Sequence, residues 1–341
     1  MSGIRDIKRQ IKSIGNTKKI TKAMEMVAAA KMRKAIEAVL RTRTYANLSW
    51  ETVLHLAKTN GHNGNGEKVL HPLLAKRAEI HPVKSREAGT TQDAGSFNGA
   101  RKVLIILISS NRGLCGGFNT ALINKAVASI KKYSQPTDFM VMGKKARVVY
   151  KYFGYNIAAE FEKEDISAGV SEVIPLAKMA ISDFLAGKYD KVFVAYTDFI
   201  SATKQLPRVR QLLPVEVEKE DKYLGVVGKD TRIGLDEKFV ADKKASHLKD
   251  EEYIYEYIFE PSPEEVLNQM IPRLVEVQLF QAILESNAAE HSARMNAMHQ
   301  ATEAATDMID DLTLTYNKAR QAGITREIAE ISAGAEALKD R

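Results

Sequence analysis

The residues in this sequence best suited to chemistry lie in a glycine-rich loop, SNRGLCGGFN (110–119), which follows an apolar run. Such a loop between a strand and a helix can cradle a phosphate, and a cysteine within it can be a nucleophile. The loop matches neither G-x-G-x-x-G nor G-x-x-x-x-G-K-[ST], and no neighbouring motif supplies an activating histidine. The pattern therefore favours a tight turn in which Cys115 is a small buried thiol, with no catalytic residue and no bound nucleotide.

Histidines could instead point to a metal site. His62, His71 and His81 lie in a turn-rich segment at spacings that match no ligand pattern, so solvated loop histidines are expected. His291 falls on the apolar face of a helical pattern, where a semi-buried polar side chain is expected rather than a ligand. We predict no metal and no cofactor.

Positive charge is concentrated at one end of the chain. Residues 1–43 hold twelve Lys or Arg against three Asp or Glu, a net charge of +9, whereas the whole chain carries +7. The stretch KKITKAMEMVAAAKMRKA (18–35) has a single acidic residue. An acidic partner for this segment is expected. The chain has one cysteine, which fits a reducing compartment, and no apolar run long enough to span a membrane.

The N-terminal segment (1–58) reads as one long helix. Ile4, Ile7, Ile11 and Ile14 follow the 3-4-3 spacing of a coiled-coil seam. Continuing this spacing would place Lys18 on the seam, so the apolar stripe is expected to shift and resume at Ile20, Met24 and Val27.

The C-terminal segment (261–341) predicts a second long helix. PSPEEVL supplies a helix start, with Ser262 as N-cap and Glu265 in a capping box, and Pro272 should kink or restart the helix. A 4-3 repeat then runs through Leu284, Ala288, His291, Met295, Met298, Thr302, Ala305, Ile309, Leu312, Tyr316 and Ala319. Residues 262–341 carry a net charge of −6, so the terminal helices should form an antiparallel coiled coil whose C-terminal tip projects beyond its partner.

Between the helices, apolar runs alternate with helical patterns. Strands are expected at 102–109, 138–142, 156–161 and 191–197, with further strands in QLPRVRQLLPVE and YIYEYIFE, and helices near 118–132, 144–153 and 171–187. This predicts an α/β domain over 102–260 with a central, Rossmann-like, mostly parallel sheet. Residues 59–101 read as an inserted surface loop or linker, and 218–252 as a charged loop or hairpin.

Three motifs, NTKKITKAMEMVAAAKMRKA, NRGLCGGFN and LTLTYNKARQAGITREIAEI, together closely resemble the γ subunit of the rotary ATP synthase. The resemblance covers roughly residues 1–58, 101–215 and 254–341. It implies a non-catalytic shaft inside a ring of three α and three β subunits, with the α/β domain at the foot against the ε subunit and the membrane-embedded c ring. It also implies a peripheral protein at the cytoplasmic face of a bacterial inner membrane, without direct lipid insertion.

The resemblance further implies which residues contact the α/β ring. These positions match family positions near an acidic loop of the β subunits or facing the ring: Lys18, Lys19, Lys22, Met24, Lys31, Arg33, Lys34, Arg294, Arg320, Gln321, Thr325 and Glu327. The chain departs from the family at Asn111, where Asp is usual, and at Arg326, where Gln is common. A single cysteine excludes the redox-active pair of the chloroplast relatives.

Two other classes of protein remain open from the residues alone. A basic coiled-coil protein that binds nucleic acid would explain the N-terminal charge, although the acidic C-terminal helix opposes it. A nucleotide-dependent enzyme with helical arms would explain the sheet, but the phosphate fingerprint and a catalytic cluster are missing.

Overall fold

The protein is described here from a computed structural model, in which residues 3–59, 72–74, 102–133, 136–165, 169–215, 260 and 263–339 are placed. The predicted strand YIYEYIFE, the charged segment 218–252, most of the inserted segment 59–101 and the N-cap Ser262 lie outside these residues. The described elements are, in chain order, α1 (Ile4–Thr59), β1 (Val103–Ile108), α3 (Phe118–Tyr133), β2 (Thr137–Met142), the 3-10 turn η1 (Lys144–Arg147), α4 (Val148–Phe153), β3 (Asn156–Phe161), η2 (Val170–Glu172), α5 (Ile174–Leu185), β4 (Lys191–Phe199), β5 (Gln205–Leu213) and α7 (Pro263–Lys339).

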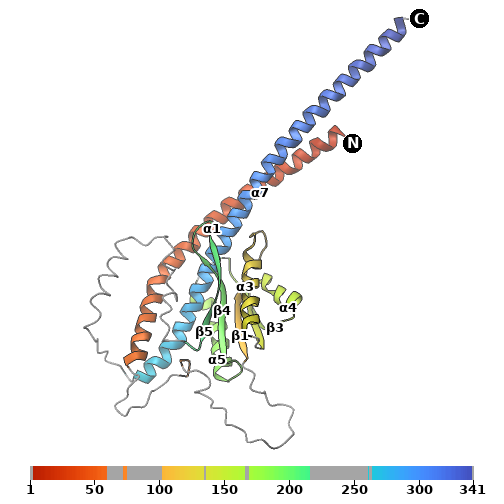
Figure 1. Cartoon of the computed structure of the whole chain (residues 1–341). Coiled ribbons are helices and arrows are strands. Elements are labelled where there is room, and N and C mark those ends of the chain that lie inside the picture. The colour runs from red at the N-terminus through yellow and green to blue at the C-terminus, as the bar shows by residue number, and fades with distance from the viewer. Residues whose placement is uncertain are drawn as a thin grey trace, which may run out of the picture. The chain divides into compact units, whose positions relative to one another are not determined.

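The sheet has five strands in the order β3-β2-β1-β4-β5 (Figure 1). β1, β2, β3 and β4 pair in parallel, and β5 is antiparallel to β4. The prediction of a mostly parallel sheet is confirmed, and β1, β2 and β3 begin and end within one residue of the predicted ranges. This strand order is the one found in Rossmann-type domains.

Apolar side chains cover both faces of the sheet, which explains why its strands read as continuous apolar runs. Alternate residues of β1 divide between the two faces: Leu104 and Ile106 join a core shared with α5 and α7, whereas Ile105 and Leu107 join a core shared with α3 and α4. All six residues of β1 are buried. The sheet is therefore a central layer between helices.

Part of the inserted segment belongs to this core. Pro72–Leu74 form a turn in which Leu73 is 1% exposed and its carbonyl accepts a hydrogen bond from the Val215 amide. The expectation of a surface loop is wrong at this turn.

The long terminal helices are shared between two compact units, one of residues 1–30 and 294–341 and the other of residues 31–293. α7 continues through Pro272 without the predicted restart. Among the described residues, none of the helices combines the length and apolarity needed to cross a membrane.

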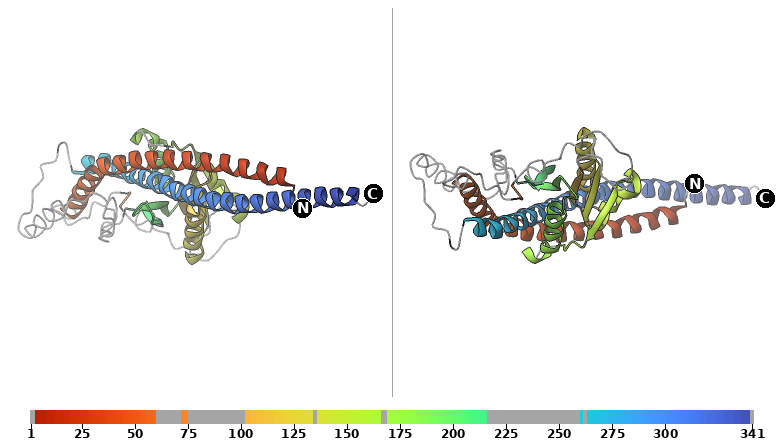
Figure 2. Two further views of the ribbon diagram at one scale, coloured as in Figure 1. Left: turned by 90° about the horizontal axis from the view of Figure 1, so that it is seen from above. Right: turned by 90° about the horizontal axis from the view of Figure 1, so that it is seen from below.

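In the first unit, α1 and α7 lie side by side and run in opposite directions (Figure 2). Thr302 Oγ1 donates to Thr21 Oγ1 at 2.8 Å, and His299 Nδ1 lies 3.4 Å from Glu25 Oε1. Near the start of α1, a Cβ added to Gly323 would lie 3.8 Å from Ile4 Cδ1. The positions predicted on α7 from Met295 to Ala319 are all buried or half-buried, so the predicted 4-3 repeat does mark the sheltered face.

The predicted shift of the α1 stripe is wrong at Ile20 and Val27, whereas Met24, its third position, is half-buried. Ile20 and Val27 are 60% and 57% exposed, whereas the less exposed positions keep the 4-3 spacing through Ile7, Ile11, Ile14, Lys18, Thr21, Glu25 and Ala28. The side of α7 that faces α1 carries Met298, Thr302 and Ala305 here. Small side chains let two helices approach closely. Lys18 is half-buried and can keep its ammonium at the rim of the contact.

The turn that follows β2 requires a glycine. Gly143 has φ +96°, and an added Cβ would lie 2.5 Å from the Ser109 carbonyl oxygen. We expect Gly143→Ala to lower the free energy of unfolding by about 1–3 kcal/mol, through strain and the backbone clash. Urea unfolding of the purified chain measures this. Gly113→Ala is the control, because an added Cβ there meets nothing within 4 Å. Equal stability of the two variants would contradict the argument.

Candidate functional site at the carboxyl end of the sheet

The glycine-rich loop continues from the carboxyl end of β1 and turns sharply into α3. Leu114 and Gly116 have positive φ values, 63° and 54°, which the chain needs in order to reverse direction before Phe118. Cys115 is 2% exposed, and its Sγ accepts a hydrogen bond from Asn119 Nδ2 at 3.2 Å. The predicted tight turn with a small buried thiol is confirmed. Cys115 packs in a cluster with Ala35 of α1 and with Ala288 of α7.

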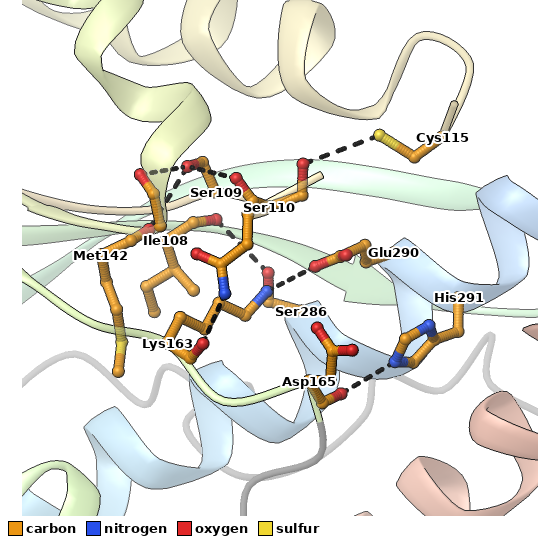
Figure 3. Close-up of polar contacts among 12 residues, drawn as sticks. Ile108, Ser109, Ser110, Cys115, Met142, Lys163, Asp165, Ser286, Glu290 and His291 are labelled. Atoms are coloured by element: carbon orange, nitrogen blue, oxygen red, sulfur yellow. Dashed lines mark hydrogen bonds and ion pairs between the residues drawn. The ribbon is translucent and has the colours of Figure 1, made fainter. Parts of the chain in front are cut away.

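A buried ion pair lies beside this loop (Figure 3). Lys163, two residues after β3, places its Nζ 2.6 Å from Glu290 Oε2 on α7, and the two side chains are only 1% and 7% exposed. Asn111 Nδ2 donates to the Lys163 carbonyl, and Asn111 Oδ1 accepts from the Lys144 amide at 3.3 Å. Because Asn111 both donates and accepts, an Asp at this position could not make the same pair of contacts.

Asp165 connects the same loop to both long helices. Lys31 Nζ of α1 lies 2.7 Å from Asp165 Oδ2, and His291 Nε2 of α7 lies 2.8 Å from the Asp165 carbonyl oxygen. The hydrogen bond from Lys31 holds the pKa of the Asp165 carboxyl below its usual value, despite partial burial. The side chain of His291, predicted to be semi-buried, is 1% exposed and hydrogen-bonded.

Two serines attach the same stretch of α7 to other parts of the sheet. Ser286 Oγ donates to the Ile108 carbonyl at 3.4 Å, and Ser292 Oγ donates to the Ala202 carbonyl at 2.6 Å. Gln205 Nε2, at the start of β5, donates in turn to Ser292 Oγ at 3.1 Å. Every residue of α7 from 281 to 292 is buried. We call the contacts made by Ser286, Glu290, His291 and Ser292 the helix–sheet junction. These contacts attach α7 to the α/β domain through hydrogen bonds and an ion pair, whereas the rest of the helix is held there by apolar packing.

The sequence did not reveal this junction. Lys163 and Glu290 are 127 positions apart, and each looks like an ordinary charged residue in its own segment. One usable signal was present: the charged run EKED follows directly on β3, at the end of the sheet where the polar side chains of parallel strands meet.

The predicted ring-contact residues divide between the two compact units. Lys18, Lys19, Lys22 and Met24 lie at the level of Thr302, and Met24 and Lys18 are half-buried while Lys19 and Lys22 are exposed. Arg320, Gln321, Thr325 and Glu327 are exposed near the level of Ile4. In the second unit, Arg33 and Lys34 are exposed, whereas Lys31 is engaged with Asp165. Arg294 is half-buried.

The fold and the junction together define an α/β protein whose Rossmann-type sheet is fixed at its carboxyl end to two long terminal helices. The family model described as ATP synthase matches residues 3–338. The chain is 38% identical to an ATP synthase gamma chain of Pelotomaculum thermopropionicum, over 99% of this chain and 100% of that one. It is 39% identical to an ATP synthase gamma chain of Herpetosiphon aurantiacus, with 99% of each chain covered. The chain therefore belongs to the γ-chain family of ATP synthase.

A solved structure has the same fold. It is a chain of the Euglena gracilis mitochondrial ATP synthase, reported as OSCP/F1/c-ring in rotational state 3, with a TM-score of 0.58 and 19% identity. The match covers 98% of this chain and 94% of that one. The relatives give no support to the alternative of a nucleic-acid-binding coiled coil.

The lowered pKa of Asp165 predicts a pH-dependent contribution to stability. An aspartate with a depressed folded-state pKa stabilises the fold above its unfolded value of about 3.9, and this contribution is lost as the pH falls through the folded value. Because the pair with Lys31 is about one-third exposed, we expect Asp165→Asn to cost no more than about 1 kcal/mol at pH 7. The cost should become smaller as the pH falls below about 3.9 and the carboxyl of the parent begins to take up a proton. Denaturant unfolding of parent and variant at pH 7 and pH 3 measures it, and an equal cost at both values would contradict the ion-pair explanation.

Proposed function

We propose that this chain is the central rotating shaft of a bacterial ATP synthase. The observation that carries the proposal is the match to the γ-chain family over nearly the whole chain, helices and α/β domain alike. In this proposal the shaft couples ion-driven rotation of a membrane c ring to conformational changes at the nucleotide sites of an α3β3 ring. The chain itself is a non-catalytic component.

We assign the shaft to an antiparallel coiled coil of the two terminal helices. Its support is the 4-3 spacing of sheltered positions on both helices and the contacts of Thr21 with Thr302 and of Ile4 with Gly323. Small and polar residues in the seam bring the helices close together. Two packed helices resist twisting better than one, which a rotating shaft requires.

The mechanism follows from asymmetry. A shaft that presents different side chains in different directions contacts three similar nucleotide sites unequally, and each orientation favours a different set of open and closed conformations. Ion flow supplies the driving force, worth ~2.3 kcal/mol per charge per 100 mV. The α/β domain would sit at the foot, against the ε subunit and the c ring, at the cytoplasmic face of the inner membrane.

The basic surface of α1 is assigned to acidic loops of the α3β3 ring. Exposed ion pairs contribute about 0.2–1 kcal/mol each, which is small enough for contacts to exchange as the shaft turns. Lys19, Lys22, Arg33 and Lys34 are exposed and suit this role. Lys18, Met24, Arg294, Arg320, Gln321, Thr325 and Glu327 complete the proposed contacts. Lys31 is also among the proposed contacts, but its ammonium already pairs with the Asp165 carboxylate within the chain.

The coiled coil can be tested by cross-linking within the full chain. Thr21→Cys with Thr302→Cys should form a disulfide on mild oxidation, because the two hydroxyl oxygens lie 2.8 Å apart. The buried Cys115 should not compete. Ile20→Cys with Thr302→Cys is the matched control, since Ile20 is 60% exposed. The cross-link should leave ATP hydrolysis and ion pumping by the assembled complex intact, because it joins two parts of the rotor. Equal cross-linking of the two pairs would exclude the proposed packing.

The ring contact can be tested at Met24. An unbranched apolar side chain tolerates changing neighbours, whereas a positive charge would favour one orientation too strongly. We expect Met24→Lys to assemble and hydrolyse ATP but to couple hydrolysis poorly to ion pumping. ATPase rate and ATP-driven ion uptake are measured together in inverted vesicles, with the exposed Arg33→Ala as the control expected to change little. A proportional loss of both activities would show a general defect of stability or catalysis instead.

A further inference from the structure

We propose that the buried pair of Lys163 and Glu290 is a torque-bearing contact: it fixes the angular position of α7 on the α/β domain when the shaft turns under load. This inference rests on the proposed function as a rotating shaft. Both residues belong to the same compact unit, and they join the loop after β3 to a helix that continues into the other unit.

The argument begins with what apolar packing cannot do. Where α7 crosses the sheet, residues such as Leu279 and Ile283 pack in the apolar core. Contacts of this kind are non-directional and tolerate repacking when the total volume is kept, so they select the angle of a helix less sharply than hydrogen bonds and ion pairs do. Torque on the shaft would turn α7 about its own axis, and apolar packing opposes this rotation less specifically than directed bonds do. Directed contacts are therefore required to hold the angle of the helix.

The helix–sheet junction supplies directed contacts over about two turns of α7. Its four side chains reach partners at different points of the domain: Ile108 at the end of β1, Lys163 and Asp165 after β3, and Ala202 between β4 and β5. Anchors at three separate points oppose rotation in either sense. Of these contacts, the one between Lys163 and Glu290 joins two buried opposite charges, so its rupture separates two ions in the interior rather than breaking one neutral hydrogen bond.

The loop that carries Lys163 is itself held on the domain. Asn111 Nδ2 donates to the Lys163 carbonyl, and Lys31 of α1 pairs with Asp165 two residues later. Force applied to Glu290 therefore passes through Lys163 into the end of β1 as well as into β3. The contact is connected to the layer of the domain that is most completely buried.

The test distinguishes a role of the Lys163–Glu290 pair in transmitting torque from a role in the stability of the fold alone. Lys163→Met alone removes the cation that faces the buried Glu290 carboxylate and should reduce both assembly and activity. Lys163→Met with Glu290→Leu should restore folding and assembly, because apolar pairs of similar volume often replace buried ion pairs without loss of stability. In vesicles that contain the assembled complex, the double variant should still hydrolyse ATP, but the number of ions pumped per ATP should fall below that of the unsubstituted chain. The deficit should widen as the opposing membrane potential rises, since slip increases with load.

Lys188→Met is the matched control, because it removes an ion pair with Asp183 on the same domain whose side chains are more exposed, at 44% and 20%. A second variant, Ser286→Ala with Ser292→Ala, removes two directed contacts of α7 without leaving a buried charge, and should show the same load-dependent deficit. A normal pumping ratio at all potentials in both double variants would overturn the inference. Failure of the unsubstituted chain to assemble with ATP synthase subunits would instead overturn the proposed function.

Discussion

The structure depends on the burial of α7 where it crosses the α/β domain. Residues 281–292 are enclosed on all sides, yet the stretch contains two glutamates, a histidine and several amide and hydroxyl side chains. A helix with this composition could not be buried in an apolar core without partners, because each unpaired polar group would cost about 1–3 kcal/mol, and a charge more. The strand ends and loops of the domain supply many of those partners. The same requirement that stabilises the fold thus also fixes the rotational setting of the helix.

The parts of this fold that local pattern determines could be predicted. A strand buried on both faces reads as a continuous apolar run, as in Val103–Ile108, and a long 4-3 repeat predicts the sheltered side of α7. The turn around Cys115 could be predicted because positive φ values near a sharp reversal favour glycine. In each case the evidence lies within a few residues of the feature.

The α1 stripe shows where such evidence misleads. Ile20 and Val27 drew the predicted seam away from Thr21, Glu25 and Ala28, which the structure shelters instead. Isoleucine is more hydrophobic than threonine or alanine. Which face of α1 is buried depends also on the partner helix, because the small residues of α7 allow the two helices to approach closely. The pair of Lys163 and Glu290 was missed for a related reason, since its energy comes from a neighbour far away in the sequence. Sequence periodicity describes one helix at a time, whereas both of these features belong to pairs of elements.

The last turns of α7 have no helix beside them among the described residues, and this lowers their bending stiffness. Beyond Gly323, which lies opposite Ile4, the helix continues to Lys339, and residues 324–333 are all exposed. A single helix bends more easily than two that are packed together. The last turns of α7 are thus more compliant than the paired segment of the same unit, and they can bend sideways while that segment stays straight. Ile324, Ile328 and Ile331 are exposed on these last turns, so the compliant end presents apolar side chains that form no directed bonds of their own.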